Sequence, residues 1–140
     1  MNRIKKIIEE TGTNDPYVIA EHLGVIVRTD PLGKVQGYYI RAYGMDAVVI
    51  NSELSEPLKR FILAHEIGHI ILHPYSTVFA MRHTLLVTDK QELEADRFAI
   101  NLLLTDEMLQ ANPHYTIDQW SSVLGLPREI VELRFKEVLL

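Results

Sequence analysis

The sequence contains no cysteine, and this absence limits its metal chemistry. Disulfides and thiolate metal sites are excluded, so any bound metal must be held by histidine, aspartate or glutamate. Long apolar runs are also missing. The most apolar stretch, residues 67–72, is interrupted by Gly68 and His69 and is far too short to span a bilayer. The N-terminal segment MNRIKKIIEE is too charged to be a signal peptide. We therefore expect a soluble, cytoplasmic protein without a membrane partner.

An excess of positive charge is absent as well. The chain has 14 lysines and arginines against 19 acidic residues, a formal net charge of −5, and no long block of one sign. An acidic domain binds a phosphate backbone poorly, so we expect no direct nucleic-acid partner. The 140 residues, 47% hydrophobic and 24% charged, are typical of one globular domain over residues 1–140. Nothing in the sequence predicts the oligomeric state.

The order of local signals predicts an α+β fold with a small sheet of about three strands packed against helices. Caps, prolines and glycines delimit the expected helices, which cover residues 2–8, 16–24, 55–73, 88–104, 105–112, 116–125 and 127–139. Short β-branched and aromatic runs predict strands at residues 25–27, 35–43 and 47–51, the last two joined as a hairpin around Gly44 and Asp46. Residues 75–87 have no clean period and are expected to form a loop.

The predicted helix over residues 55–73 carries the sequence HEIGH, from His65 to His69. Its two histidines are four residues apart, so they project from one helical face and can bind one metal ion together. Glu66 lies about a quarter turn round the helix, where it can act as general base on a water that zinc activates. Gly68 leaves space for another element against this helix. An apolar helix that carries these polar groups needs partners for them, and zinc supplies one.

Two histidines do not hold a catalytic zinc, which needs a third protein ligand and an open position for water. A histidine six residues after His69 would supply that ligand, but the position is occupied by Tyr75. His73 is two helical turns from His65 and cannot easily bend back to the same ion. We interpret His73 as a structural residue that faces the carboxyl end of the helix dipole.

The next predicted helix offers a better third ligand. Glu92 and Asp96 share one face with Ala95 and Ala99, whose small side chains allow close helix approach. Glu92 would be the third metal ligand, with Glu94 as the alternative. Asp96, one turn further on, is placed to accept a hydrogen bond from the second ring nitrogen of a ligating histidine.

These segments resemble the ImmA/IrrE family of zinc metallopeptidases. The resemblance rests on HEIGHIILHP followed by ELEADRFAINLLL, and on TNDPYVIAEHLGVIV, GYY and VVIN before them, and it covers nearly the whole chain. It implies a compact zincin-like fold and the wider gluzincin pattern, in which Glu92 is the third ligand and Asp96 supports a histidine. It also implies limited proteolysis of a specific protein, commonly a helix-turn-helix repressor of a prophage or mobile element. The chain has no room for an added sensor domain, so we expect regulation by a partner or by cellular state.

Hydrolysis also needs a group that stabilises the oxyanion. The sequence does not choose among five candidates, which are Tyr38, Tyr39, Tyr75, His83 and His114. The two adjacent tyrosines are the first to consider, because they lie on a predicted strand just before the metal-binding helix. That strand is also suited to pair with an extended peptide substrate.

The segment 116–139 resembles a helix-turn-helix, but its second helix begins with Arg128 followed at once by Glu129, a poor start for reading DNA. We expect a helical hairpin that packs on the domain. The side chains expected to make this contact are Trp120, Val123, Leu124, Ile130, Leu133 and Phe135.

Three other functions stay open at this stage. The main alternative is a non-catalytic module that captures a repressor or antitoxin-like partner, with a structural metal whose fourth ligand is His73, His83 or His114. A DNA-binding regulator would show salt-sensitive binding, which the acidic charge disfavours. A broad-specificity peptidase would cut unrelated unfolded proteins. The sequence also does not prove zinc over other divalent ions.

Overall fold

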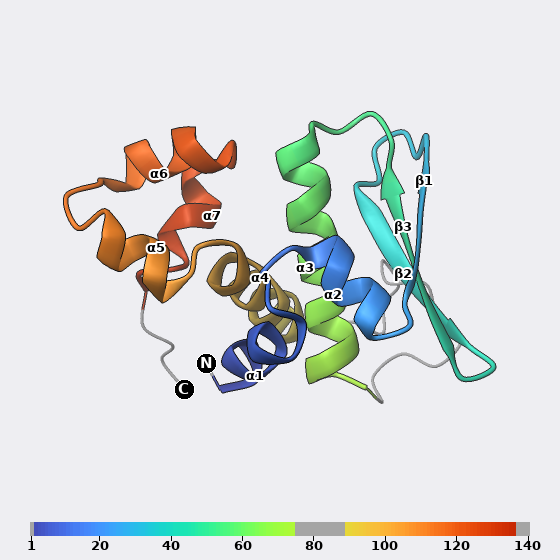
Figure 1. Cartoon of the computed structure of the whole chain (residues 1–140). Coiled ribbons are helices and arrows are strands. Elements are labelled where there is room, and N and C mark those ends of the chain that lie inside the picture. The colour runs from blue at the N-terminus through green and yellow to red at the C-terminus, as the bar shows by residue number, and fades with distance from the viewer. Residues whose placement is uncertain (1, 75–88, 137–140) are drawn as a thin grey trace.

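The computed structural model describes residues 2–74 and 89–136 and shows an α+β fold (Figure 1). The predicted loop 75–87 and the predicted helix cap at Thr88 lie outside these residues. Within the described ranges, every helix is too short or too polar to cross a membrane. In chain order the elements are α1 Asn2–Thr11, α2 Pro16–His22, β1 Ile26–Asp30, β2 Gly37–Ala42, β3 Met45–Asn51, α3 Glu56–Leu72, α4 Asp89–Leu103, α5 Asp106–Ala111, α6 Ile117–Leu124 and α7 Arg128–Glu132.

The three strands form one mixed sheet with β3 in the centre, parallel to β1 and antiparallel to β2. The predicted hairpin of β2 and β3 is confirmed. Its turn places Tyr43 and Gly44 in left-handed backbone, with φ of 55° and 75°. β1 extends to Asp30, beyond the predicted end at Val27, because its parallel pairing with β3 continues to Asn51. Pairing with a strand that is distant in the sequence thus extends β1 beyond the short β-branched run that predicted it.

Helix starts agree with the capping residues in the sequence. The Asp15 side chain accepts a hydrogen bond from the Tyr17 backbone N–H at 2.9 Å, and Ser55 caps α3. Thr116 and Gln119 form the predicted reciprocal capping box at the start of α6. These caps fix where α2, α3 and α6 begin, so the position of HEIGH within α3 follows from local sequence.

α3 lies between the sheet and α4, and the close approach of its neighbours depends on glycine (Figure 1). A Cβ atom at Gly68 of α3 would lie 3.1 Å from the Phe98 ring of α4, and one at Gly37 of β2 would lie 2.5 Å from Ile62 of α3. The prediction that Gly68 leaves room for another element is therefore confirmed. The helix that carries HEIGH is held from both sides by the sheet and by α4.

Replacing Gly68 by valine is expected to destabilise the fold by about 1–3 kcal/mol, because the added atoms overlap the buried Phe98 ring. Chemical denaturation of Gly68→Val, Phe98→Leu and the double variant measures this. If Phe98 is the obstacle, the double variant loses less stability than the two single losses added together. Simple additivity of the two losses would contradict the proposed steric conflict.

α6 and α7 form the expected helical hairpin, but its packing differs from the prediction. Trp120 is buried as predicted, whereas Val123 and Phe135 are 59% and 48% exposed, so these two predicted contacts are wrong. Leu126 and Val131 are the side chains that enter the core instead. The turn after α6 and the short length of α7 change which side chains face inward. The pattern of apolar residues alone did not determine which helical face is buried.

α7 ends at Glu132, so the predicted helix to residue 139 is wrong over the described part of the chain. The following residues form i→i+3 turns. Arg134 in this segment donates hydrogen bonds to the Leu104 carbonyl at 2.7 Å and to the Asp106 carboxylate at 2.6 Å. This anchoring to the end of α4 and the start of α5 favours the tight turns over a continued helix.

The positive charge of Arg128, the first residue of α7, is balanced by two acidic neighbours. Arg128 donates to the Glu132 carboxylate at 2.9 Å and also to that of Asp118. Both partners hold the guanidinium in the charged form and raise the pKa of Arg128, with the Asp118 hydrogen bond as the largest cause. A basic group engaged in this way is poorly placed to contact DNA phosphates.

Candidate metal centre

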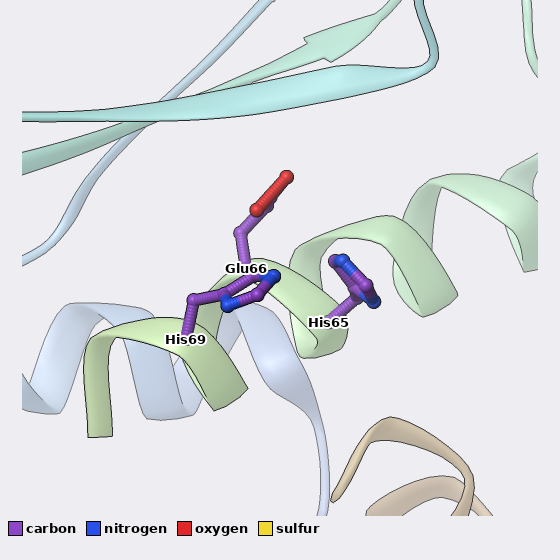
Figure 2. Close-up of side chains that lie close together, drawn as sticks. All are labelled: His65, Glu66 and His69. Carbon is purple, nitrogen blue, oxygen red and sulfur yellow. The ribbon is translucent and has the colours of Figure 1, made fainter. Parts of the chain in front are cut away.

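The middle of α3 places three polar side chains in an otherwise apolar environment. His65, Glu66 and His69 are 5%, 1% and 1% exposed, although their neighbours in the helix are hydrophobic. The imidazoles come from successive turns, with ring centroids 4.8 Å apart, and Glu66 points towards the sheet (Figure 2). One possible ligand atom from each of the three residues lies within 4.8 Å of the others. Burial of this much polarity costs stability unless the groups have partners.

α4 brings Glu92 to the same place. Its Oε1 atom lies 2.6 Å from His69 Nε2 and 3.6 Å from His65 Nε2. The carboxylate is 31% exposed, so it lies at the open side of the buried histidine pair. The Nε2 atoms of both histidines and one Glu92 oxygen therefore lie close together.

Asp96 lies one turn further along α4, against the other nitrogen of His65. His65 Nδ1 donates a hydrogen bond to Asp96 Oδ1 at 2.7 Å, and its Nε2 atom faces Glu92 Oε1 at 3.6 Å. His65 Nε2 is buried and has no hydrogen-bond partner among the described residues. Burial lowers the pKa of His65, but the hydrogen bond to Asp96 and the neighbouring carboxylates outweigh it and raise the pKa to about 9. The surroundings of His65 thus favour a positive charge.

These residues fit a divalent metal ion. Two imidazole nitrogens and one carboxylate oxygen form a donor set that suits zinc. The buried Nε2 atom of His65, held in the correct tautomer by Asp96, is the kind of atom that a metal would satisfy. Both Glu66 and Glu92 are close enough to the histidine pair to be considered as the carboxylate donor, Glu66 from α3 itself and Glu92 from α4.

Glu94, the alternative third ligand from the sequence, lies beside a different histidine. Its Oε1 atom is 3.7 Å from His73 Nε2. His73 is the C-cap of α3, and its Nδ1 atom lies 3.2 Å from His69 Nδ1, the nitrogen on the other side of the ring from Glu92. Sequence reasoning treated His73 as an isolated helix-terminal residue and missed this contact. The repeated four-residue spacing from His65 was the signal that could have revealed it.

Arg41 of β2 links the sheet to the end of α3, the helix that carries HEIGH, a contact that the sequence did not indicate. It donates to Asp46 Oδ1 at 2.7 Å and to the Ile70 carbonyl at 3.5 Å, and it also contacts the Pro74 carbonyl. The Ile70 carbonyl belongs to the last turn of α3, where carbonyls lack helical partners and a cation is favoured, and Pro74 follows the helix. Arg41 therefore helps to fix the turn of α3 that carries His69.

The five candidates for oxyanion stabilisation are separated by the structure. Tyr39 is fully buried and its ring stacks on His69 at a centroid distance of 5.9 Å. Strand alternation directs Tyr38 to the opposite face of β2, and His114 is exposed between α5 and α6. Tyr75 and His83 lie outside the described residues. Tyr39 is therefore the described candidate that lies against the histidine pair.

Comparison with known families agrees with this geometry. A sequence profile of a peptidase family, M78, described as the IrrE N-terminal-like domain, matches residues 20–136. The chain belongs to this family. The ImmA/IrrE resemblance inferred from HEIGH and ELEAD is thereby confirmed.

Two relatives of this ImmA/IrrE-family chain align over most of its length. Metallopeptidase ImmA of Bacillus subtilis strain 168 is 25% identical over 142 residues, which cover 98% of this chain and 84% of that protein. Uncharacterized immunity region protein 2 of Bacillus phage phi105 is 31% identical over 135 residues, which cover 94% of this chain and 85% of that protein. The family thus joins metallopeptidases with proteins of phage immunity regions.

Proposed function

We propose that this chain is a zinc-dependent endopeptidase that cuts a regulatory protein at a specific site. The observation that carries the proposal is the convergence of His65 Nε2, His69 Nε2 and Glu92 Oε1, with a buried Glu66 beside them. Three protein donors leave a coordination position for water or substrate, which distinguishes a catalytic zinc site from a closed structural one. The rival with a structural metal would need a fourth protein ligand. Of its three candidates, His73 contacts the far nitrogen of His69 and His114 is exposed between α5 and α6, whereas His83 lies outside the described residues.

In this proposal His65, His69 and Glu92 hold the metal. Zinc, when bound, supplies a Lewis acid that lowers the pKa of water towards neutrality and polarises a carbonyl group. Asp96 keeps the proton of His65 on Nδ1 and so keeps Nε2 available as a donor. The close packing of α4 on α3 sets the position of the Glu92 carboxylate against the two imidazoles.

Glu66 carries the proton transfers. Its carboxylate takes a proton from the attacking water while the water oxygen forms a bond to the scissile carbonyl carbon. The same carboxyl group then gives this proton to the amide nitrogen as the C–N bond breaks and the C=O bond re-forms. A carboxylic acid and an amine are released, the acid loses its remaining proton to water, and Glu66 is restored as a carboxylate. Burial at 1% exposure keeps bulk water from replacing Glu66 in these steps.

The expected substrate is a helix-turn-helix repressor of a prophage or mobile element. The relative from Bacillus phage phi105 is an immunity region protein, which supports a substrate of this kind. A repressor is a protein whose loss by a single cut switches a regulatory state, so one specific cleavage is sufficient.

The test is cleavage of a candidate partner, a helix-turn-helix repressor that is encoded near the gene where one is found there. Zinc-loaded protein is incubated with this partner and, separately, with an unrelated unfolded protein. In a further control, the protein is treated with a chelator before it is mixed with the partner. The proposal predicts one defined fragment pair, which disappears with the chelator, and no cutting of the unfolded protein. Cutting of both substrates would favour a broad-specificity peptidase. An uncut partner that binds the chain would favour capture.

Replacing Asp96 by asparagine is expected to weaken zinc binding by about 10–100-fold, the usual cost of losing a group that orients a ligating histidine. An amide in this position no longer attracts the Nδ1 proton as a carboxylate does, so His65 loses its preferred tautomer. Zinc competition with a chromophoric chelator measures the dissociation constant. Wild-type affinity in Asp96→Asn would show that the 2.7 Å hydrogen bond does not support the metal site.

A further inference from the structure

Two histidines of α3 and the histidine that follows it as its C-cap form a continuous row. His65, His69 and His73 follow one another at four-residue spacing, with ring centroids 4.8 Å and 5.4 Å apart. The His73 side chain is only 8% exposed, and its backbone N–H bonds to the His69 carbonyl at 2.9 Å. His73 is therefore held against His69 by both its backbone and its buried position, although it lies beyond the last residue of the helix.

The nitrogens in this row allow one assignment of protons that is consistent with a metal site. If His69 Nε2 is a ligand, the His69 proton is on Nδ1, and that atom donates to His73 Nδ1 at 3.2 Å. The proton of His73 is then on its own Nε2 atom, which faces Glu94 Oε1 at 3.7 Å. The order of groups is Glu94, His73, His69 and then the ligand position beside Glu92.

We propose that His73 is a positioning residue that orients His69 for metal binding, with Glu94 behind it. This proposal rests on the proposed metal site. His73 would accept the Nδ1 proton of His69, as Asp96 accepts the Nδ1 proton of His65. Each ligating histidine would then have its own support, a carboxylate for one and a second imidazole for the other. Such groups fix the ring orientation and raise the donor strength of the ligand.

A matched pair of amides separates this role from simple packing. Asparagine at position 73 places its amide group near the Nδ1 position of histidine, whereas glutamine places its amide near the Nε2 position. Both are polar and both are compatible with a position after the last helical residue. His73→Asn therefore keeps an acceptor for His69, and His73→Gln moves it out of place.

The experiment measures metal binding and requires no substrate. Zinc dissociation constants come from chelator competition, visible spectra of the cobalt-substituted forms report the coordination, and denaturation of the metal-free proteins reports stability. We expect His73→Gln to weaken zinc binding by about 10–100-fold and to alter the cobalt spectrum, while His73→Asn stays within about threefold of wild type. The metal-free variants should unfold at similar denaturant concentrations.

Equal affinity of the two variants would overturn the proposal, whether both match wild type or both are weakened alike. A loss of metal-free stability in His73→Gln that accounts for its whole loss of affinity would also overturn it. Because the readout is metal binding, a chain that binds zinc and cleaves nothing would contradict the proposed peptidase activity and leave the result for His73 standing.

Discussion

Glu66→Gln is expected to bind zinc as well as wild type and to lose cleavage by about 100- to 10,000-fold, the usual contribution of a general acid–base group. Glutamine has nearly the same shape as glutamate and can occupy the same buried position. Its amide cannot accept and return a proton, so both proton transfers of the proposed reaction fail.

The measurement combines zinc content with initial cleavage rates of the repressor-like partner. Glu56→Gln is the matched control. Glu56 is the first residue of the same helix, ten residues before Glu66, and its side chain is 61% exposed. The control should retain wild-type cleavage. Undiminished cleavage by Glu66→Gln would exclude Glu66 as the proton carrier, and loss of zinc from the variant would instead indicate that Glu66 is a ligand.

Glu92→Ala is expected to lose zinc more severely than any variant of a supporting group, with a fall in affinity greater than about 100-fold. Alanine removes the oxygen that lies 2.6 Å from His69 Nε2 and 3.6 Å from His65 Nε2, and two imidazoles alone do not hold a catalytic zinc. Cleavage should be lost together with the metal.

Glu94→Ala provides the comparison, because this neighbouring glutamate contacts His73 rather than the converging nitrogens. Its zinc affinity should fall by no more than about 100-fold, as for a supporting group. Chelator competition and metal analysis after dialysis measure both variants. Full zinc occupancy in Glu92→Ala, with loss in Glu94→Ala, would exchange the roles of the two residues.

Much of the fold and site followed from local sequence rules. Capping residues located the starts of the helices, and the four-residue spacing placed His65 and His69 on one face. The small residues of α4 predicted the helix contact that carries Glu92 and Asp96. These features depend on periodicity and side-chain size, which a single sequence contains.

Other features depend on contacts between distant segments and could not be derived in this way. The strand over residues 26–30 continues past its short β-branched run because β3 lies beside it. Arg41 reaches the end of α3 from a strand, and nothing near it in the sequence indicates that partner. The exposure of Val123 and Phe135 follows from the turn geometry around α7, since the apolar pattern was compatible with either burial or exposure.

The most direct test of the proposed hydrolysis is cleavage of the repressor-like partner in heavy-oxygen water, with the fragments weighed by mass spectrometry. Zinc-loaded wild-type protein should release one fragment pair with the heavy label in the new terminal carboxylate, and Glu66→Gln should release none. An intact partner that binds wild type and Glu66→Gln equally well would contradict the peptidase account and indicate a protein that acts by capture.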